Sequence, residues 1–77
     1  PVTARVRLAP GRAAAVRRLA APTEASPWDA TELTVSAGSL GQLVAVVCGA
    51  GADAVVIEPS EVVEAVRAAL QAVLDAS

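Results

Sequence analysis

The sequence predicts an α+β domain with the ferredoxin-like βαββαβ order, followed by one more helix at the C-terminus. Two patterns support this fold class. Apolar residues alternate with polar ones in residues 2–8 and 33–37, and a short β-branched run occupies residues 54–57. Apolar residues recur at helical spacing after each of the first, third and fourth predicted strands. With 77 residues the chain is long enough for one small domain.

The first strand covers residues 2–8, whose period-two pattern predicts one buried and one exposed face. Pro10 and Gly11 end it. Apolar residues then return at helical spacing from residue 13, so we expect a helix that stops before Pro22 and carries Arg17 and Arg18 on its solvent side.

The segment from Pro22 to Thr31 contains two prolines and predicts turns. We expect a short second strand around Thr23–Ala25, at a sheet edge where proline is tolerated, and then a turn at Pro27–Asp29. Trp28 lies in this turn. Because tryptophan is usually largely buried, packing over an edge of the core is favoured over contact with a ligand.

The third strand ends at Gly38, and a capping box formed by Ser39 and Gln42 predicts a second helix. The glycines of "GAGADA", residues 49–54, satisfy a G-x-G-x-x-A dinucleotide pattern. A nucleotide site would need a strand before these glycines, whereas the capping box places a helix there. We therefore interpret them as a helix C-cap, followed by a buried fourth strand that Pro59 stops.

The last helix is predicted to start at Ser60 and to be amphipathic. Its apolar positions form more than one stripe, so the helix could cover its own domain and still serve a dimer. The candidate dimer-interface residues are Val62, Val66, Leu70 and Val73.

Catalytic chemistry is not supported by the composition. The chain has no His, Lys or Tyr, and the single Cys48 lies in an apolar run typical of core packing. We expect no catalytic residues, no metal site, no cofactor and no enzymatic activity. No apolar run is long enough to span a membrane, and a cytoplasmic location fits the cysteine content.

Arginines concentrate near the N-terminus: residues 1–22 hold five Arg and no acid, whereas residues 23–77 hold eight acids and one Arg. Strand periodicity places Arg5 and Arg7 on the open sheet face, close to Glu32, and Arg12 at the joint before the first helix. Two interpretations stay open. Either Arg5 or Arg7 pairs with Glu32 while the helix arginines are solvated, or Arg5, Arg7 and Arg12 contact an effector or a neighbouring subunit.

Residues 48–70, "CGAGADAVVIEPSEVVEAVRAAL", resemble the WCX domain, the C-terminal extension of WYL-domain transcriptional regulators. The opening "VTARVRLAP" is similar to the start of the same module, so the resemblance covers nearly the whole chain. Departures are Leu40 where Trp-Leu is common, no closing Tyr in the last helix, and a short, proline-rich second-strand segment.

The resemblance implies one WCX-like domain over residues 1–77, the C-terminal part of a longer bacterial regulator. It further implies a homodimer, upstream WYL and helix-turn-helix domains in the same chain, and DNA binding through that upstream part. The domain would border an effector pocket for a nucleic-acid ligand. Two alternatives stay open: a ferredoxin-like domain that senses amino acids or other small molecules, and a purely structural assembly domain.

Overall fold

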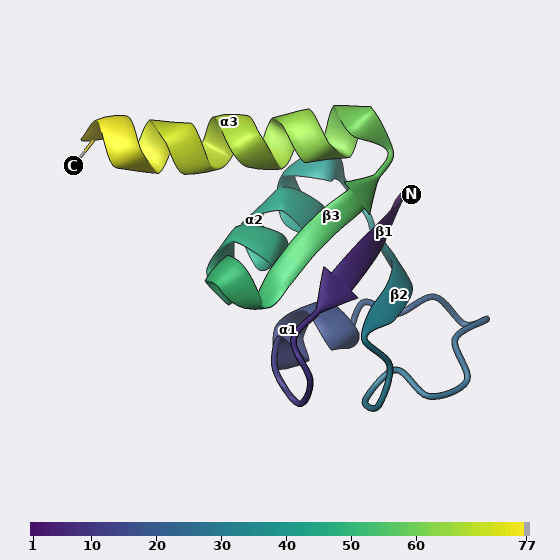
Figure 1. Cartoon of the computed structure of the whole chain (residues 1–77). Coiled ribbons are helices and arrows are strands. Elements are labelled where there is room, and N and C mark those ends of the chain that lie inside the picture. Colours follow the sequence, from purple (N-terminus) through teal and green to yellow (C-terminus); the bar gives the residue numbers. More distant parts are fainter. Residues whose placement is uncertain (77) are drawn as a thin grey trace.

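The computed structural model describes residues 1–76 and shows a small α+β domain built on a three-stranded antiparallel sheet (Figure 1). The strand order is β2-β1-β3, so β1 is central and the other two strands are edges. The elements are β1 (Val2–Leu8), α1 (Ala14–Arg17), β2 (Glu32–Ala37), α2 (Leu40–Ala50), the 3-10 turn η1 (Gly51–Asp53), β3 (Ala54–Glu58) and α3 (Ser60–Ala76).

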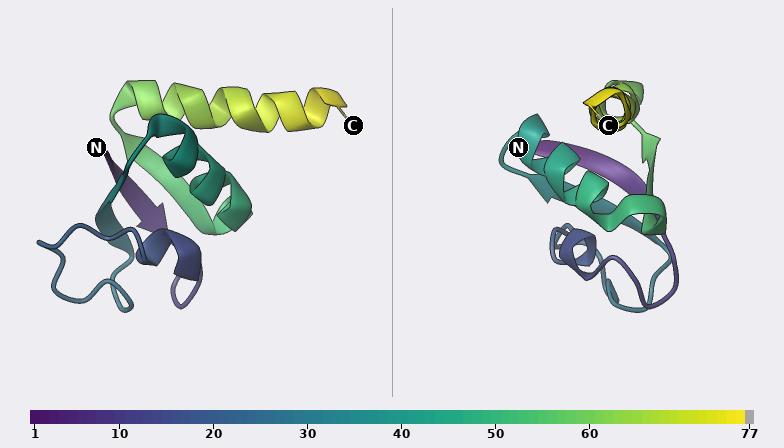
Figure 2. Two further views of the ribbon diagram at one scale, coloured as in Figure 1. Left: turned by 180° about the vertical axis from the view of Figure 1, so that it is seen from behind. Right: turned by 90° about the vertical axis from the view of Figure 1, so that its left-hand side faces the viewer.

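One face of the sheet is covered by α1 and α2, and the other is open (Figure 2). The strand β1 pairs with β2 in continuous register from Val2 opposite Ala37 to Arg7 opposite Glu32. Consequently the even-numbered residues of β1 from Ala4 onward face the helices and are buried, while Arg5 and Arg7 lie on the open face. The predicted first and third strands and their two faces are confirmed.

The core between the sheet and the helices is entirely aliphatic, as the composition predicts. Leu33 and Leu43 are its largest fully buried side chains. Leu8 and several valine and alanine side chains complete it, and such small side chains suit a sheet and helices that approach closely. Its members are Ala4, Val6, Leu8, Val16, Leu33, Val35, Ala37, Leu43, Val47, Ala54, Val56 and Val62.

The helix α2 begins and ends as the sequence predicts. The Ser39 hydroxyl accepts a hydrogen bond from the Gln42 backbone N–H at 3.1 Å, and the Gln42 side chain accepts one from Gly38 at 3.2 Å. At the other end Gly51 is the C-cap with φ of 62°, a left-handed value that favours glycine. The order is helix, glycine, strand, which is the reverse of a dinucleotide-binding turn.

The predicted second strand around Thr23–Ala25 is wrong, because the structure places no strand between α1 and β2. The free edge of β2 is instead met by Leu19–Ala21, through a single antiparallel bridge between Ala20 and Val35. Further along that edge the Glu24 carboxylate accepts the Thr34 backbone N–H at 2.9 Å. A side chain thus satisfies a donor that the missing strand would have satisfied. The sheet and helices agree with the α+β class, but the full βαββαβ order is not formed.

The first helix is shorter than predicted. It spans only Ala14–Arg17 and is preceded by Ala13, whose φ of 62° lies in the left-handed region. After Arg17 the chain tightens: Leu19 and Ala20 donate to carbonyls three residues back. This tightening directs the chain toward the edge of β2 instead of along a longer helix.

The strand β3 was predicted to be buried, and this is only half right. Ala54 and Val56 are buried, but Val55 is 57% exposed and Ile57 is 41% exposed. As an edge strand, β3 hydrogen-bonds only to β1. From its end the chain turns into α3, whose first residue is Ser60 and whose first backbone donors reach the Pro59 carbonyl.

Candidate interaction surfaces

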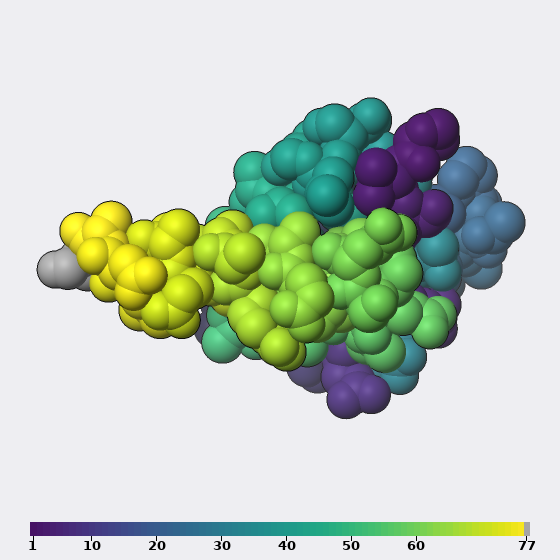
Figure 3. All heavy atoms as spheres, turned by 90° about the horizontal axis from the view of Figure 1, so that it is seen from above, coloured from purple at the N-terminus to yellow at the C-terminus, as the bar shows by residue number. Residues whose placement is uncertain are grey.

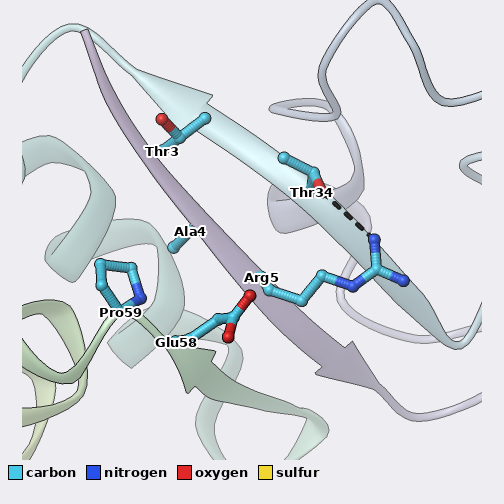
Figure 4. A pocket seen from close by; sticks show the side chains of 6 residues that line it. All are labelled: Thr3, Ala4, Arg5, Thr34, Glu58 and Pro59. Carbon is cyan, nitrogen blue, oxygen red and sulfur yellow. Dashed lines mark hydrogen bonds between the residues drawn. The ribbon is translucent and has the colours of Figure 1, made fainter.

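The open sheet face places Arg5 among polar partners from the neighbouring elements. Its guanidinium donates to the Thr34 hydroxyl at 3.2 Å and lies 3.6 Å from the Glu24 carboxylate and 3.7 Å from that of Glu32. Figure 4 shows Glu58 from β3 beside the stem of the same side chain. A shallow hollow of about 270 Å³ lies here, lined by Thr3, Ala4, Arg5, Thr34, Glu58 and Pro59.

The Arg7 guanidinium lies 3.9 Å from Glu32, so Glu32 bridges both arginines of the open face. The interpretation in which Arg5 or Arg7 pairs with Glu32 is confirmed for both residues. With Glu24, Glu32 and Glu58 around them, these two arginines are outnumbered by carboxylates. An anionic ligand would have to displace the acids before it could use Arg5, which makes this face a poor anion site.

Arg12 is not part of this face. It lies in the turn after β1, where its backbone N–H donates to the Ala9 carbonyl at 3.1 Å, and its side chain is exposed. The three arginines grouped as candidate effector contacts are therefore separated into an ion-paired pair on the sheet and one exposed residue in a turn.

Arg17 was predicted to be solvated, and this is wrong: it is the only charged residue buried among residues 1–76, with 3% exposure. Its guanidinium donates to four backbone carbonyls, those of Arg12 at 2.7 Å, Pro27 at 2.7 Å, Ala9 at 3.0 Å and Ala30. We call this arrangement the Arg17 clamp. The planar fork of five N–H donors allows one side chain to join two loops, which the ammonium of lysine could not do.

The Arg17 clamp fixes the loop that displays Trp28. The carbonyls of Pro27 and Ala30, on either side of Trp28 in the sequence, both accept from the same guanidinium nitrogen. Trp28 itself is 55% exposed. The expectation that it packs over the core is wrong, because the loop bends around Arg17 and leaves the indole at the surface.

The third surface is an apolar groove between α3 and the edge strand β3, which we call the α3–β3 groove. It has a volume of about 570 Å³, and its apolar wall includes Val55 of β3 together with Val66, Leu70 and Leu74 of α3. Arg67 and Gln71 add polar groups to the same lining. Leu70 is 44% exposed and Leu74 is 69% exposed. Figure 3 shows the C-terminal half of α3 standing clear of the rest of the molecule.

The four candidate interface residues of α3 occupy different environments. Val62 is 1% exposed and belongs to the core, so it has no surface to offer a partner. Val66 packs against the core with part of its side chain and lines the groove with the rest. Leu70 lies in the groove and Val73, 64% exposed, lies on the projecting half of the helix. Of the four candidate residues, only Val66, Leu70 and Val73 therefore have side-chain surface that a partner could contact.

Within residues 1–76 no three or more of His, Cys, Asp and Glu gather in a way that could hold a metal ion. Cys48 is a half-buried free thiol. None of the helices in this part of the chain is long and apolar enough to cross a membrane.

The comparison with known families agrees with the architecture. The family model of the WCX domain matches residues 1–74, almost the entire chain. The chain belongs to the WCX domain family. No curated protein and no solved structure shows a significant match. The resemblance stated from the sequence is thereby confirmed, and the shortened α1 and the missing second strand are features of this WCX domain.

Proposed function

We propose that this WCX domain is a non-catalytic module that pairs two copies of a bacterial WYL-type transcriptional regulator. The observation that carries the proposal is the apolar surface around the α3–β3 groove. Leu70 and Leu74 are substantially exposed on a regular helix, and the neighbouring edge strand exposes Val55. Contiguous apolar surface of this kind is typical of a protein–protein contact.

In this proposal the upstream WYL and helix-turn-helix domains belong to the same cytoplasmic protein, and they bind the DNA operator. The WCX domain contributes no chemistry of its own. Membership of the WCX family supports the assignment to a regulator, and the scarcity of acid-base and nucleophilic side chains supports a binding role.

Pairing is tested by sedimentation equilibrium of the 77-residue chain over a wide range of concentrations. We expect a reversible monomer–dimer equilibrium. A chain that stays monomeric up to millimolar concentration would rule out a pairing role for this domain.

The proposal includes an effector pocket bordered by this domain in the complete regulator. Among the arginines considered for that role, Arg12 is the one whose side chain no ion pair within residues 1–76 engages. In the full-length regulator, replacing Arg12 by Ala should weaken the thermal shift caused by a short single-stranded DNA. A panel of amino acids serves as the comparison, and a shift with amino acids alone would favour the small-molecule-sensing alternative.

A further inference from the structure

The exposed side of α3 carries a charge pattern that is complementary to itself. Arg67, Gln71 and Asp75 follow one another at spacings of four residues, so they form one polar line along the helix. The apolar line of Leu70 and Leu74 runs beside it, inside the α3–β3 groove. The positive end of the polar line points toward the body of the domain and the negative end toward the projecting tip.

Such a pattern distinguishes between the two ways in which a second copy of the helix can lie alongside. In a parallel pair related by a two-fold axis, Arg67 would lie level with Arg67 and Asp75 level with Asp75, so like charges would meet. In an antiparallel pair whose two-fold axis passes near Gln71, each Arg67 meets the other copy's Asp75. The favourable contact is then formed twice, as an isologous interface requires.

The apolar line fits the same arrangement. With the axis near Gln71, Leu70 of each copy comes close to Leu74 of the other, and the projecting half of each helix lies along the groove of its neighbour. The groove wall from β3 carries Val55, and β3 has no charged side chain between its terminal residues Ala54 and Glu58. The part of β3 that lines the groove, Ala54–Val56, therefore presents no charge to the second helix.

The contacts that Arg67, Gln71 and Asp75 make within one copy of the chain are weak. Arg67 pairs with Glu64 at 3.3 Å, but their side chains are 70% and 66% exposed, so solvent screens the pair. Gln71 donates to Asp75 at 3.0 Å, also at the surface. Each of these exposed contacts is worth little, so intermolecular contacts of the same side chains can replace them.

We propose that two copies of this chain pair through antiparallel α3 helices, with each Arg67 against the other copy's Asp75 and each Leu74 in the other copy's α3–β3 groove. This proposal rests on the proposed pairing function and specifies its surface. The occupant of the groove is thus a second copy of the same helix.

Charge reversal at the two ends of the polar line tests the proposal. Arg67→Glu alone and Asp75→Arg alone each place like charges at both symmetric contacts, and each should raise the dimer dissociation constant about tenfold or more. The double variant restores opposite charges in exchanged positions and should recover most of the wild-type affinity. Sedimentation equilibrium measures the constants, and circular dichroism at low concentration checks that each variant keeps its helix content.

Two further variants complete the experiment. Glu61→Arg makes the same charge change as Asp75→Arg in the first turn of α3, which lies outside the stretch that the second helix would cover, and it should leave the dissociation constant unchanged. Leu74→Glu should abolish dimerisation. If the wild type dimerises but the single reversals have no effect, or the double variant fails to recover, this interface is wrong while the pairing function survives. A wild-type chain that stays monomeric would overturn both.

Discussion

The N-terminal loops and the C-terminal helix of this small domain differ in opposite directions in two properties, regular secondary structure and burial. The N-terminal half contains a long irregular segment, Ala9–Thr31, with only one turn of α-helix, yet it is tied down by the buried guanidinium of Arg17. The C-terminal helix α3 is the longest regular element, yet all residues from Leu70 to Ala76 are exposed. Regular secondary structure and burial are therefore separate properties here, and each predicts a different response to substitution.

The largest effect is expected in the irregular half. Replacing Arg17 by Ala removes the donors of four carbonyls at once and should lower the free energy of unfolding by about 3 kcal/mol. Urea denaturation followed by circular dichroism measures this loss. Arg17→Lys keeps the charge without the planar fork and should recover less than half of it.

Trp28 gives the same experiment a local readout, because it is the sole aromatic residue of the chain. In Arg17→Ala the loop loses its attachment, so the fluorescence anisotropy of Trp28 should fall under conditions where the protein is still folded. An unchanged anisotropy would show that the loop keeps its shape without the Arg17 clamp.

The helix α3 should divide into a sensitive and an insensitive part. Val62→Ala creates a cavity in the core and should cost about 2 kcal/mol. Leu74→Ala, measured at concentrations where the chain is monomeric, should cost less than about 0.5 kcal/mol. A similar cost for both substitutions would mean that the tip of α3 packs on its own domain after all.

A smaller effect is expected at the entrance to α1. Ala13 has φ of 62°, and a left-handed conformation costs an L-residue about 1 kcal/mol. Ala13→Gly should therefore raise the thermal midpoint, with a gain of about 0.5 kcal/mol after the entropy of glycine is counted. Ala15→Gly, inside the same helix turn, is the matched control and should destabilise instead.

The smallest effect concerns the open sheet face. A double-mutant cycle with Arg5→Ala and Glu32→Gln should give a coupling energy of about 0.5 kcal/mol, because both side chains are partly exposed. The coupling should shrink in high salt. A coupling above about 2 kcal/mol would place this pair in the same class as the Arg17 clamp and remove the contrast between the two regions.

The sequence predicted the observed elements correctly where strand periodicity or a helix cap determines them. The alternation in residues 2–8 and 33–37, the capping box at Ser39 and the glycine at the end of α2 all led to the observed elements. These are local signals, each carried by a few neighbouring residues. The arginine pairs with Glu32 followed from the same periodicity, since strand pairing brings residues 5, 7 and 32 together.

The errors arose where one side chain replaces a backbone element. The Glu24 carboxylate accepts the Thr34 N–H at the edge of β2, so this donor is satisfied without a second strand. Arg17 donates to carbonyls of two loops, so these carbonyls are satisfied without a longer helix. Helical periodicity predicted that Arg17 faces solvent, because that argument assumes that every charged side chain is solvated. The burial of Arg17 follows only from the three-dimensional structure, in which backbone carbonyls of two loops converge on one buried place and need hydrogen-bond donors.

The Arg17 clamp also affects how this loop can change in evolution. All four of its acceptors are backbone oxygens, which every amino acid supplies. The side chains at positions 9, 12, 27 and 30 are therefore not constrained by the clamp, and neither are Trp28 and Asp29 between the last two. Because Arg17 alone holds the course of the loop, the outward-facing residues of the loop can differ from one WCX domain to another without a change in the fold.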